Sequence, residues 1–436
     1  MKKVAKCMTL ALALALTVLL AVMPMNALAE DITLQMSWWG GESRHEAILK
    51  VIELFEAQNP GVKIEAQYSA FAQYRDKFNI QLTSGASADI MAVDAPWAAG
   101  LVANGDYFLD LAEYPDLVDM SQFDAAMVDG FCNYDGKIYF VPGGVNGMGS
   151  LVDLSVLKEF GLTGEETSFT WNDLIELGKK VHEANPEQYL CCVDSKQAAL
   201  YYARVYLRQL TGRQLINDDG TMGCTREELA EALKLVDTLY KEGIFQPIAE
   251  HGVYNNTMTQ NPDWINRNMF MILGRTSVMT DMSARLPKED GSYTTTGFVM
   301  PIKEDAVESG IEVRPGILYA VKKECAYPEL AVKFINFMFT DPEAVVALGA
   351  TYSIPACENS RQIAKAAGVL DESALKNVEY SLANSGSKLN DWSSNSEVEA
   401  LFTEIMEKIA YNQYGDMLEA ADEVIERIAD IVESHS

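Results

Sequence analysis

The sequence has few of the residues and motifs on which catalytic and metal sites are usually built. Its 436 residues include only four histidines, so a histidine-based triad or a three-histidine metal site has few ways to form. It contains no nucleophile elbow, no Walker loop, no dinucleotide-binding glycine fingerprint and no His-Glu-x-x-His zinc motif. We therefore expect a protein that is not an enzyme and that uses neither a cofactor nor a metal ion.

Basic residues are also scarce. The 34 lysines and arginines face 63 aspartates and glutamates, which gives a formal net charge of −29. Such a surface repels phosphate backbones and anionic lipids, so binding to nucleic acid or to a membrane surface is excluded. The hydrophobic content of 48% and the charged content of 22% are those of an ordinary globular chain, and the length suggests two domains.

Long hydrophobic runs are confined to the beginning of the chain. Residues 1–29 have the pattern of a secretory signal, in which three lysines precede an uncharged run over 7–23 and an Ala27-Leu28-Ala29 cleavage pattern follows. An uncleaved anchor is the alternative, because 17 uncharged residues lie at the lower edge of membrane-spanning length. We expect an extracytoplasmic protein, either periplasmic or secreted and associated with the cell surface.

The cysteines show no metal-binding or redox spacing. Six of the seven lie outside the expected signal, and none belongs to a Cys-x-x-Cys pattern. A redox-active pair at Cys191-Cys192 is the alternative to buried thiols, which we expect. The six cysteines are Cys132, Cys191, Cys192, Cys224, Cys325 and Cys357.

Strand and helix patterns alternate at the start of the expected mature chain. Strands are predicted at 32–37, 62–68 and 90–93, separated by a helix that begins at a Ser43/Glu46 capping box and by a second helix ending near residue 84. This order predicts a parallel sheet of the α/β class, which binds ligands at the carboxyl ends of its strands.

The middle and the end of the chain are predicted to be largely helical. Capping boxes are expected at Thr170/Asp173 and at Thr225/Glu228, and Trp171, directly after the first cap, is expected to face the core. A further strand is predicted at 317–321, followed by helices at 328–339 and 415–432.

Two extended segments are predicted to connect two lobes. The first runs from a strand at 137–141 into the glycine-rich stretch 142–147, interpreted as a flexible crossover, with a phosphate cradle as the alternative. The second, 294–301, returns the chain to the first lobe. The predicted N-terminal lobe is 30–143 plus 300–340, and the C-terminal lobe is 144–299 plus 341–436.

Aromatic residues follow the predicted strands. Trp38-Trp39 follows the first strand, Trp97 follows the third, and Trp392 lies in a loop rich in serine and asparagine. A sugar ring has an apolar face and a rim of hydroxyls, so it needs flat aromatics for stacking and planar polar groups at its edge. Suitable polar residues are Glu42, Arg44, Asp94, Asn146 and Arg275.

Six short segments, taken in order, resemble the family 1 extracellular solute-binding proteins of ABC importers, the maltose-binding-like group. These segments are 38–41, 55–64, 88–91, 136–142, 169–171 and 328–334. The resemblance covers nearly the whole expected mature chain. It implies a two-lobed periplasmic-binding-protein-like fold that closes on a carbohydrate between the lobes.

Combined with the aromatic pattern, the resemblance implies a specific ligand site. The expected ligand-binding residues are Trp39, Glu42, Arg44, Asp94, Trp97, Asn146, Tyr202, Arg275 and Trp392. Two segments depart from the family pattern, namely Val152-Asp153 and 266–268. Arg275 stands where an aromatic residue often stacks, which argues against maltodextrin and favours an acidic or densely hydrogen-bonding sugar.

The predicted function is the carbohydrate-binding component of an ABC importer, with a mono- or oligosaccharide as ligand. Its expected partners are the membrane permease subunits, and the protein itself is expected to be a monomer. Two alternatives stay open, a secreted carbohydrate-active enzyme using two of the many carboxylates, and a sugar-sensing binding protein that serves a receptor.

Overall fold

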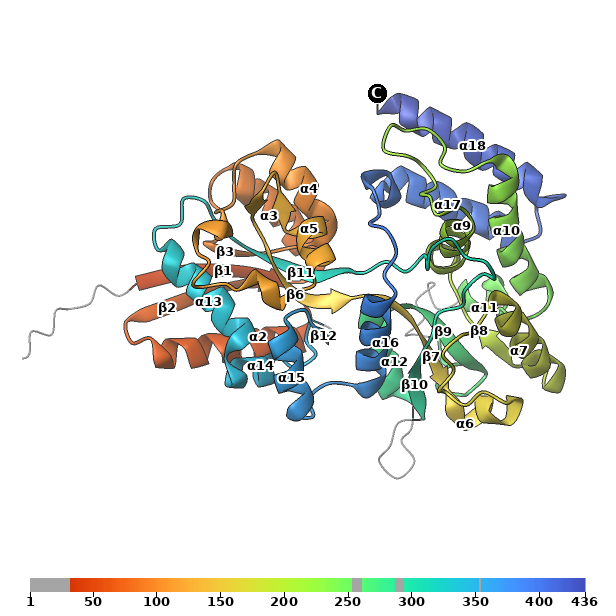
Figure 1. Ribbon diagram of the computed structural model, residues 1–436, viewed down its shortest axis with the longest axis horizontal. Coiled ribbons are helices and arrows are strands. Elements are labelled where there is room, and N and C mark those ends of the chain that lie inside the picture. Colours follow the sequence, from red (N-terminus) through yellow and green to blue (C-terminus); the bar gives the residue numbers. More distant parts are fainter. Residues whose placement is uncertain (1–31, 253–260, 287–293, 353, 436) are drawn as a thin grey trace, which may run out of the picture.

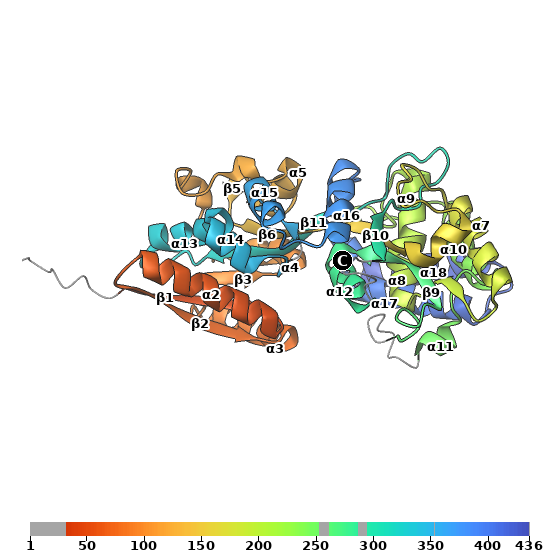
Figure 2. The same ribbon diagram turned by 90° about the horizontal axis from the view of Figure 1, so that it is seen from below.

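The computed structural model describes residues 32–252, 261–286, 294–352 and 354–435, so the expected signal peptide lies outside the described residues. The chain forms two lobes that lie side by side along the long axis of the molecule, each built on its own sheet (Figure 1). The same two lobes are seen in the perpendicular view of Figure 2. The predicted α/β class and two-lobed architecture are confirmed.

The first lobe contains a six-stranded mixed sheet. In spatial order its strands are β12 (Ile354–Pro355), β6 (Val141–Asn146), β11 (Arg314–Val321), β3 (Ile90–Val93), β1 (Ile32–Trp39) and β2 (Val62–Ser69). β1 pairs in parallel with both β2 and β3, as the alternating pattern predicts. The helices of this lobe are α2 (Glu42–Gln58), α3 (Phe71–Thr83), α4 (Ala95–Asn104), α5 (Ala125–Phe131), α13 (Pro328–Thr340), α14 (Pro342–Leu348) and α15 (Glu358–Ala366), and a small hairpin joins β4 (Asn133–Tyr134) to β5 (Lys137–Ile138).

Hydrophobic pattern explains these elements. All four residues of β3 are buried, as expected for a central strand covered on both faces. α2 buries Ile48, Val51, Ile52 and Phe55, which recur at helical spacing. The expected Ser43/Glu46 capping box is wrong, because α2 begins at Glu42 after an extended Gly41 that supplies no capping side chain.

The second lobe contains a four-stranded sheet. Its strands are, in order, β10 (Thr295–Phe298), β7 (Met148–Asp153), β9 (Met269–Arg275) and β8 (Tyr189–Cys191). Its helices are α6 (Leu154–Leu157), α7 (Trp171–Ala184), α8 (Ser195–Gln197), α9 (Arg204–Thr211), α10 (Arg226–Lys241), α11 (Ile248–Gly252), α12 (Thr276–Arg285), α16 (Glu372–Ala383), α17 (Ser396–Ala410) and α18 (Met417–Ser434). The capping boxes predicted before α7 and α10 are both present.

Three segments connect the lobes. β6 passes into β7 at Gly147, residues 299–313 lead from β10 to β11, and residues 367–371 lead from α15 to α16. The third connection differs from the predicted boundary at 341. α14 packs against α2 and β12 pairs with β6, so residues 342–366 lie with the first sheet. The helix that begins at Asp341-Pro342, α14, therefore still belongs to the first lobe.

The glycine-rich stretch 142–147 lies at the first crossing between the lobes, as predicted, but the predicted flexibility is wrong. Most of it forms β6, where every residue is buried and no glycine has a positive φ. A Cβ atom added to Gly144 would lie 2.1 Å from the carbonyl oxygen of Tyr352, and one added to Gly147 would lie 2.5 Å from Ser381. These glycines are therefore needed for close packing at the connection between the sheets.

The thiols follow the prediction. All six described cysteines are buried and free, and burial raises the pKa of Cys191 to about 12. Within the described ranges no group of histidine, cysteine or acidic residues has the arrangement of a metal site. No helix in that part of the chain is both long and apolar enough to cross a membrane.

Candidate functional site

The carboxyl ends of the first-lobe strands face the second lobe. The register of β1 with β3, in which Ser37 pairs with Met91, places Trp39 level with Val93. β11 runs antiparallel to β3 and pairs Leu318 with Val93, so its first residue, Arg314, projects beyond the end of β3. This edge of the sheet is where open α/β sheets bind ligands.

Aromatic rings gather at this edge. Trp39, Phe71 and Trp97, which we call the aromatic platform, come from the ends of β1, β2 and β3. Phe71 stacks on Trp97 with ring centroids 5.6 Å apart, and Trp39 lies 5.9 Å from Trp97. Phe71 is 42% exposed, Trp97 is half-buried and Trp39 is only 7% exposed. The outer rings of the platform therefore keep apolar faces accessible.

The platform includes one residue that the sequence analysis missed. Phe71 is the first residue of α3 and follows β2 as directly as Trp97 follows β3. Its position directly after the second strand could have identified Phe71 from the sequence, but aromatic residues were considered only after the first and third strands. Trp38, in contrast, is fully buried, and its indole N–H donates to His45 Nδ1 at 3.1 Å.

Asp94 lies beside the platform at the start of α4. Burial raises the pKa of its carboxyl above the ordinary value, while the positive charges of Arg314 and Arg75 act in the opposite direction. The Arg75 guanidinium also lies 6.0 Å from the Trp97 ring centroid. The structure thus brings the predicted Asp94 and Trp97 together at one sheet edge, joined by two arginines that the sequence analysis had not singled out.

The other predicted first-lobe residues have different surroundings. Arg44 Nη1 donates to the Trp39 carbonyl at 3.1 Å and Nη2 donates to the Thr351 carbonyl at 3.2 Å, so this guanidinium holds two backbone segments together. These bonds use two of the five N–H donors of the guanidinium, so the contact of Arg44 with a sugar stays a prediction. Glu42 is exposed at the start of α2.

Asn146 occupies the connection between the two sheets. Its side chain is 9% exposed, and its Oδ1 accepts a hydrogen bond of 3.3 Å from the Ser277 N–H at the start of α12. Its backbone carbonyl accepts from Arg275 Nη1 at 3.4 Å. Asn146 therefore ties β6 of the first lobe to the end of β9 in the second.

Three arginines meet at this connection: Arg204 and Arg275 come from the second lobe, and Arg314 is the first residue of β11 in the first-lobe sheet. We call Arg204, Arg275, Arg314 and the carboxylate of Glu312 the arginine cluster. Arg275 forms an ion pair with Glu312, and both side chains are nearly buried. Arg204 is 9% exposed, and its Nη1 donates to the Ser393 carbonyl at 3.0 Å. Arg275 pairs across β9 and β7 with Met148, so the cluster lies where the two sheets join.

The charges of the cluster act on one another. Burial disfavours ionisation of Glu312, but Arg275 and Arg314 outweigh this effect and hold its pKa below the ordinary value. Burial lowers the pKa of Arg314, and repulsion from Arg275 lowers it further. Burial also lowers the pKa of Arg204. The single buried glutamate thus leaves the positive charges of the other two arginines incompletely balanced.

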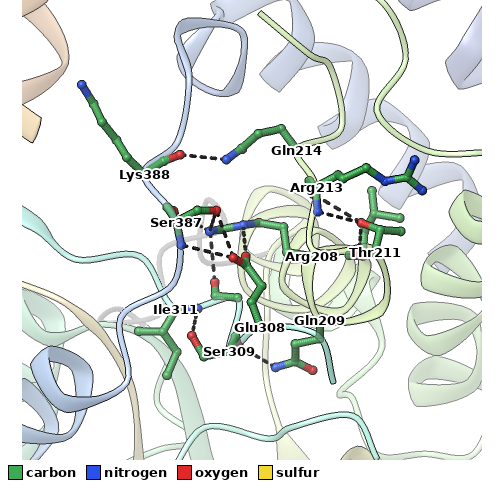
Figure 3. Close-up of polar contacts among 12 residues, drawn as sticks. Arg208, Gln209, Thr211, Arg213, Gln214, Glu308, Ser309, Ile311, Ser387 and Lys388 are labelled. Carbon is green, nitrogen blue, oxygen red and sulfur yellow. Dashed lines mark hydrogen bonds and ion pairs between the residues drawn. The ribbon is translucent and has the colours of Figure 1, made fainter. Parts of the chain in front are cut away.

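A second ion pair holds the neighbouring loop. Arg208 Nε lies 2.8 Å from Glu308 Oε1, and Arg208 Nη2 donates to the carbonyl of Ser387 at 2.5 Å (Figure 3). In Figure 3 the Lys388 side chain points away from this network, and its ammonium lies 5.5 Å from the Phe131 ring centroid of α5 in the first lobe. The network therefore fixes a loop that reaches from the second lobe to the first.

Two adjoining pockets lie along this contact. One is lined by α5 and by residues 385–389, and the other by the arginines of the second lobe. They share Glu312 and Leu389 in their linings, so they adjoin at the junction of the lobes.

Tyr202 is not part of this junction, which corrects its predicted role as a sugar platform. Its side chain is fully buried in the second-lobe core, 4.8 Å from the Phe245 ring and 5.8 Å from the Trp171 ring. The preceding residue, Tyr201, is the one that interacts with Arg275. A π-helical turn over Ala198–Ala203 sets this orientation, which a regular helical pattern does not reveal.

Trp392 is half-buried against the second-lobe core. Its ring lies edge-on to His435 at 5.8 Å, and the following residue, Ser393, accepts the hydrogen bond from Arg204. The segment that carries Trp392 therefore contacts the arginine cluster through its backbone.

The two segments that depart from the family pattern, Val152-Asp153 and 266–268, contact each other. Arg267 Nε donates to Asp153 Oδ2 at 3.2 Å, and Asp153 is fully buried. Arg267 adopts a positive φ of 58° in the turn before β9. The charge of Arg267 therefore neutralises that of Asp153, and neither residue lines the junction pockets.

Solved structures with the same fold are known. A periplasmic solute-binding protein from Pectobacterium atrosepticum superposes with a TM-score of 0.81 at 22% identity, over 92% of this chain and 99% of that one. A periplasmic oligogalacturonide-binding protein from Yersinia enterocolitica, in complex with saturated digalacturonic acid, gives a TM-score of 0.78 at 22% identity, over 92% and 99% of the two chains.

Sequence comparison points to the same group. A binding protein of Brucella abortus is 22% identical over 201 residues, so the match spans about half the length of each protein (45% of this chain and 47% of the relative). The family described as bacterial extracellular solute-binding proteins matches residues 41–345, which is well over half of the chain. The chain therefore belongs to the family of bacterial extracellular solute-binding proteins.

Proposed function

We propose that this protein is the extracytoplasmic carbohydrate-binding component of an ABC importer and that it binds its ligand at the junction of the lobes. The observation that carries this proposal is the aromatic platform at the carboxyl ends of β1, β2 and β3. A partly buried Trp97 beneath an exposed Phe71, flanked by Asp94 and Arg75, offers an apolar face with polar groups at its rim. This combination suits the stacking and hydroxyl binding that a sugar requires.

The second lobe supplies the opposite wall of the proposed site. Arg204, Arg275 and Glu312 of the arginine cluster line one junction pocket, the loop at 385–389 lines the other, and the segment of Trp392 lies beside them. The structural similarity to a protein that binds an oligogalacturonide supports an oligosaccharide ligand. Of the predicted residues, Trp39, Arg44, Asp94, Trp97, Asn146, Arg275 and Trp392 stay in this proposal, with Glu42 at its edge.

The proposed mechanism is binding without chemistry. Three connections join the lobes, so that bending at them would bring the aromatic platform of the first lobe and Arg204 and Arg275 of the second lobe onto opposite sides of a sugar. Ligand would select the closed arrangement, and a monomer in that arrangement would dock on the permease subunits with both lobes. The proposed location outside the cytoplasm follows from the family and from the expected signal over 1–29.

The test is to screen a panel of sugars for binding and for turnover. Thermal shift measures binding, because a ligand that binds only the folded protein raises its melting temperature. Chromatography of the recovered sugar measures turnover. We expect at least one mono- or oligosaccharide to raise the melting temperature and to be recovered intact.

Other outcomes separate the alternatives. A sugar that is converted to products would replace the binding-only function by that of a carbohydrate-active enzyme. Tight binding of an amino acid or peptide, with every sugar inert, would overturn the ligand class. Pull-down of the purified, ligand-loaded protein with membranes that contain its own permease would separate an importer component from a protein that serves a receptor.

A further inference from the structure

The arginine cluster concentrates positive charge in a strongly acidic protein. The whole chain has a net charge of −29, yet three guanidinium groups gather at the lobe junction around Glu312, with Asp94 on the far side of Arg314. Arg275 pairs with Glu312, whereas the Arg204 and Arg314 side chains form no ion pair within 4 Å among the described residues. These two guanidinium groups attract an anion that reaches the junction, although the acidic surface around them repels anions.

The guanidinium groups of Arg204 and Arg314 have N–H donors without an acceptor among the described residues. Arg275 is committed to Glu312, to Asn146 and to the backbone carbonyl of Glu312. Arg204 makes one hydrogen bond, to Ser393, with the described residues. Arg314 makes no hydrogen bond or ion pair closer than 4 Å within the described ranges and is only partly exposed. A guanidinium carries five N–H donors in a fixed fork, so most donors of these two side chains have no protein acceptor among those residues.

Keeping such charges half-buried costs free energy. A partly buried guanidinium without a partner loses water contacts and gains no ion pair in return. The lowered pKa values of Arg204 and Arg314 have this cause, since burial is the largest influence on both. A bound anion would restore the balance, which is the pattern of a preorganised binding group.

We infer that Arg314 and Arg204 bind a carboxylate of the ligand, so that the protein takes an acidic sugar of the uronate class. This inference rests on the proposed function, because it specifies the sugar bound at the same junction. A carboxylate matches the planar fork of an arginine in a bidentate pair. The sugar ring of the same residue would then stack on the aromatic platform.

The ligand arm of the test compares acids with matched neutral sugars by calorimetry. Galacturonate, glucuronate and digalacturonate are set against galactose, glucose and the methyl ester of digalacturonate. Loss of a buried charge pair at an interface costs about 2 kcal/mol or more, so we expect at least one acid to bind about 30-fold or more tighter than its neutral counterpart. Inorganic phosphate and sulfate, tested alone, are expected to bind more weakly than the uronate.

The protein arm uses three variants. Arg314→Gln is expected to weaken uronate binding about 30-fold while leaving the affinity for the methyl ester within about twofold. Arg314→Lys keeps the charge but not the fork, so an intermediate loss is expected, and this variant carries the test where Arg314→Gln fails to fold. Arg213→Gln is the matched control, because Arg213 forms an ion pair with Glu228 on the surface and is half exposed. It should bind like the unaltered protein.

The outcomes that overturn the inference differ from those that overturn the proposed function. A neutral sugar that binds as tightly as every uronate, or unchanged uronate affinity in Arg314→Gln, overturns the carboxylate site and leaves the sugar-binding function standing. Phosphate or sulfate that binds as tightly as the uronate overturns the choice of carboxylate. Failure of every sugar in the panel to bind overturns both.

Discussion

The two lobes bring different chemistry to their junction. The first lobe presents the aromatic platform, whose rings pack on one another and leave Phe71 42% exposed. The second lobe and its connecting segment present guanidinium groups that are nearly buried and held by Glu312 and Glu308. One side is apolar and open, and the other is charged and enclosed.

The two sides of the junction are expected to contribute differently to ligand affinity and to folding stability. A partly exposed ring supports little of the core, so it is available for affinity and dispensable for folding. Buried ion pairs are different, because removal of one partner leaves a charge without compensation. We therefore expect substitutions in the platform to change affinity, and substitutions behind the arginines to change stability. The predictions below test this contrast in order of expected effect.

The largest effect is expected for Trp171→Ala, behind the arginine side. Trp171 is 3% exposed, and its indole N–H donates to Gln209 Oε1 at 2.7 Å. Gln209 in turn donates to the Pro301 and Ser309 carbonyls of the segment that connects the lobes. The variant should lose about 3–5 kcal/mol of unfolding free energy. Denaturant unfolding measures this, and the folded fraction should bind ligand normally. Stability within 1 kcal/mol of the unaltered protein would contradict it.

Glu308→Gln should come next. The change leaves the Arg208 guanidinium, whose side chain is 5% exposed, without a charged partner. Because Glu308 itself is 16% exposed and water offers some compensation, we expect a loss of about 2–3 kcal/mol of unfolding free energy. Glu228→Gln breaks the exposed pair with Arg213 and serves as the control, with an expected change below about 0.5 kcal/mol. Equal melting temperatures of the two variants would refute the contrast between buried and exposed pairs.

On the platform, Trp97→Ala should reduce ligand affinity and spare the fold. The ring is half-buried under Phe71, so its removal should weaken binding of the identified sugar by about 1–3 kcal/mol. Calorimetry gives the affinity, and melting gives the stability. Unchanged binding, or a loss of stability as large as that of Trp171→Ala, would show that the site lies elsewhere.

A smaller loss of affinity is expected for Phe71→Ala. Phe71 adds only the outer face of the platform, so binding should weaken by about 1 kcal/mol, the scale of a single aromatic contact. Ile80→Ala, at an exposed apolar residue on the same helix, is the control and should leave affinity unchanged. A variant of Phe71 that binds as tightly as this control would remove Phe71 from the proposed site.

The smallest effect is expected far from the junction, in the surface charges of α17 and α18. Hydrogen bonds from Arg427 and Lys408 lower the pKa of Glu404 to about 2, from an ordinary value of 4.5. A depressed pKa means that this carboxylate stabilises the fold above pH 4.5 and that the contribution is lost as the pH falls toward 2. Glu404→Gln should cost about 0.5 kcal/mol or less at pH 7, because these groups are exposed.

The pH series supplies the check. The difference in unfolding free energy between Glu404→Gln and the unaltered protein should shrink as the pH falls from 5 toward 2. A difference that stays constant or grows on acidification would contradict the assignment of the effect to this carboxylate.

The first-lobe half of the candidate site could be predicted because it depends on local order. Alternation and helical spacing predicted β1, β2 and β3, and a residue that directly follows a parallel strand must lie at its carboxyl end. Trp97 and Asp94 were found in this way. Phe71 was missed although it obeys the same rule. The predictions that failed, a capping box at Ser43 and flexible glycines in β6, concerned backbone geometry decided by packing partners such as Tyr352.

The second-lobe half could not be predicted in the same way. Tyr201 interacts with Arg275 while Tyr202 is buried in the core, and both lie in a π-helical turn that no periodicity in the sequence marks. Arg204, Arg275 and Arg314 lie on three separate elements, and only the crossing of the chain between lobes brings them to Glu312. Only the folded chain shows that Arg44 also donates to the carbonyl of Thr351, which is distant in sequence.

The sequence by itself thus determined the α/β class, the two lobes, the buried thiols and the aromatic residues at the first sheet edge. These depend on hydrophobic period and on chain order, which are local properties. Tertiary structure decided which charges meet, which of two adjacent tyrosines faces the junction and where the chain passes between lobes for the third time. Charge pairs and close backbone contacts join residues distant in sequence, and their free energy depends on burial that only the folded chain defines.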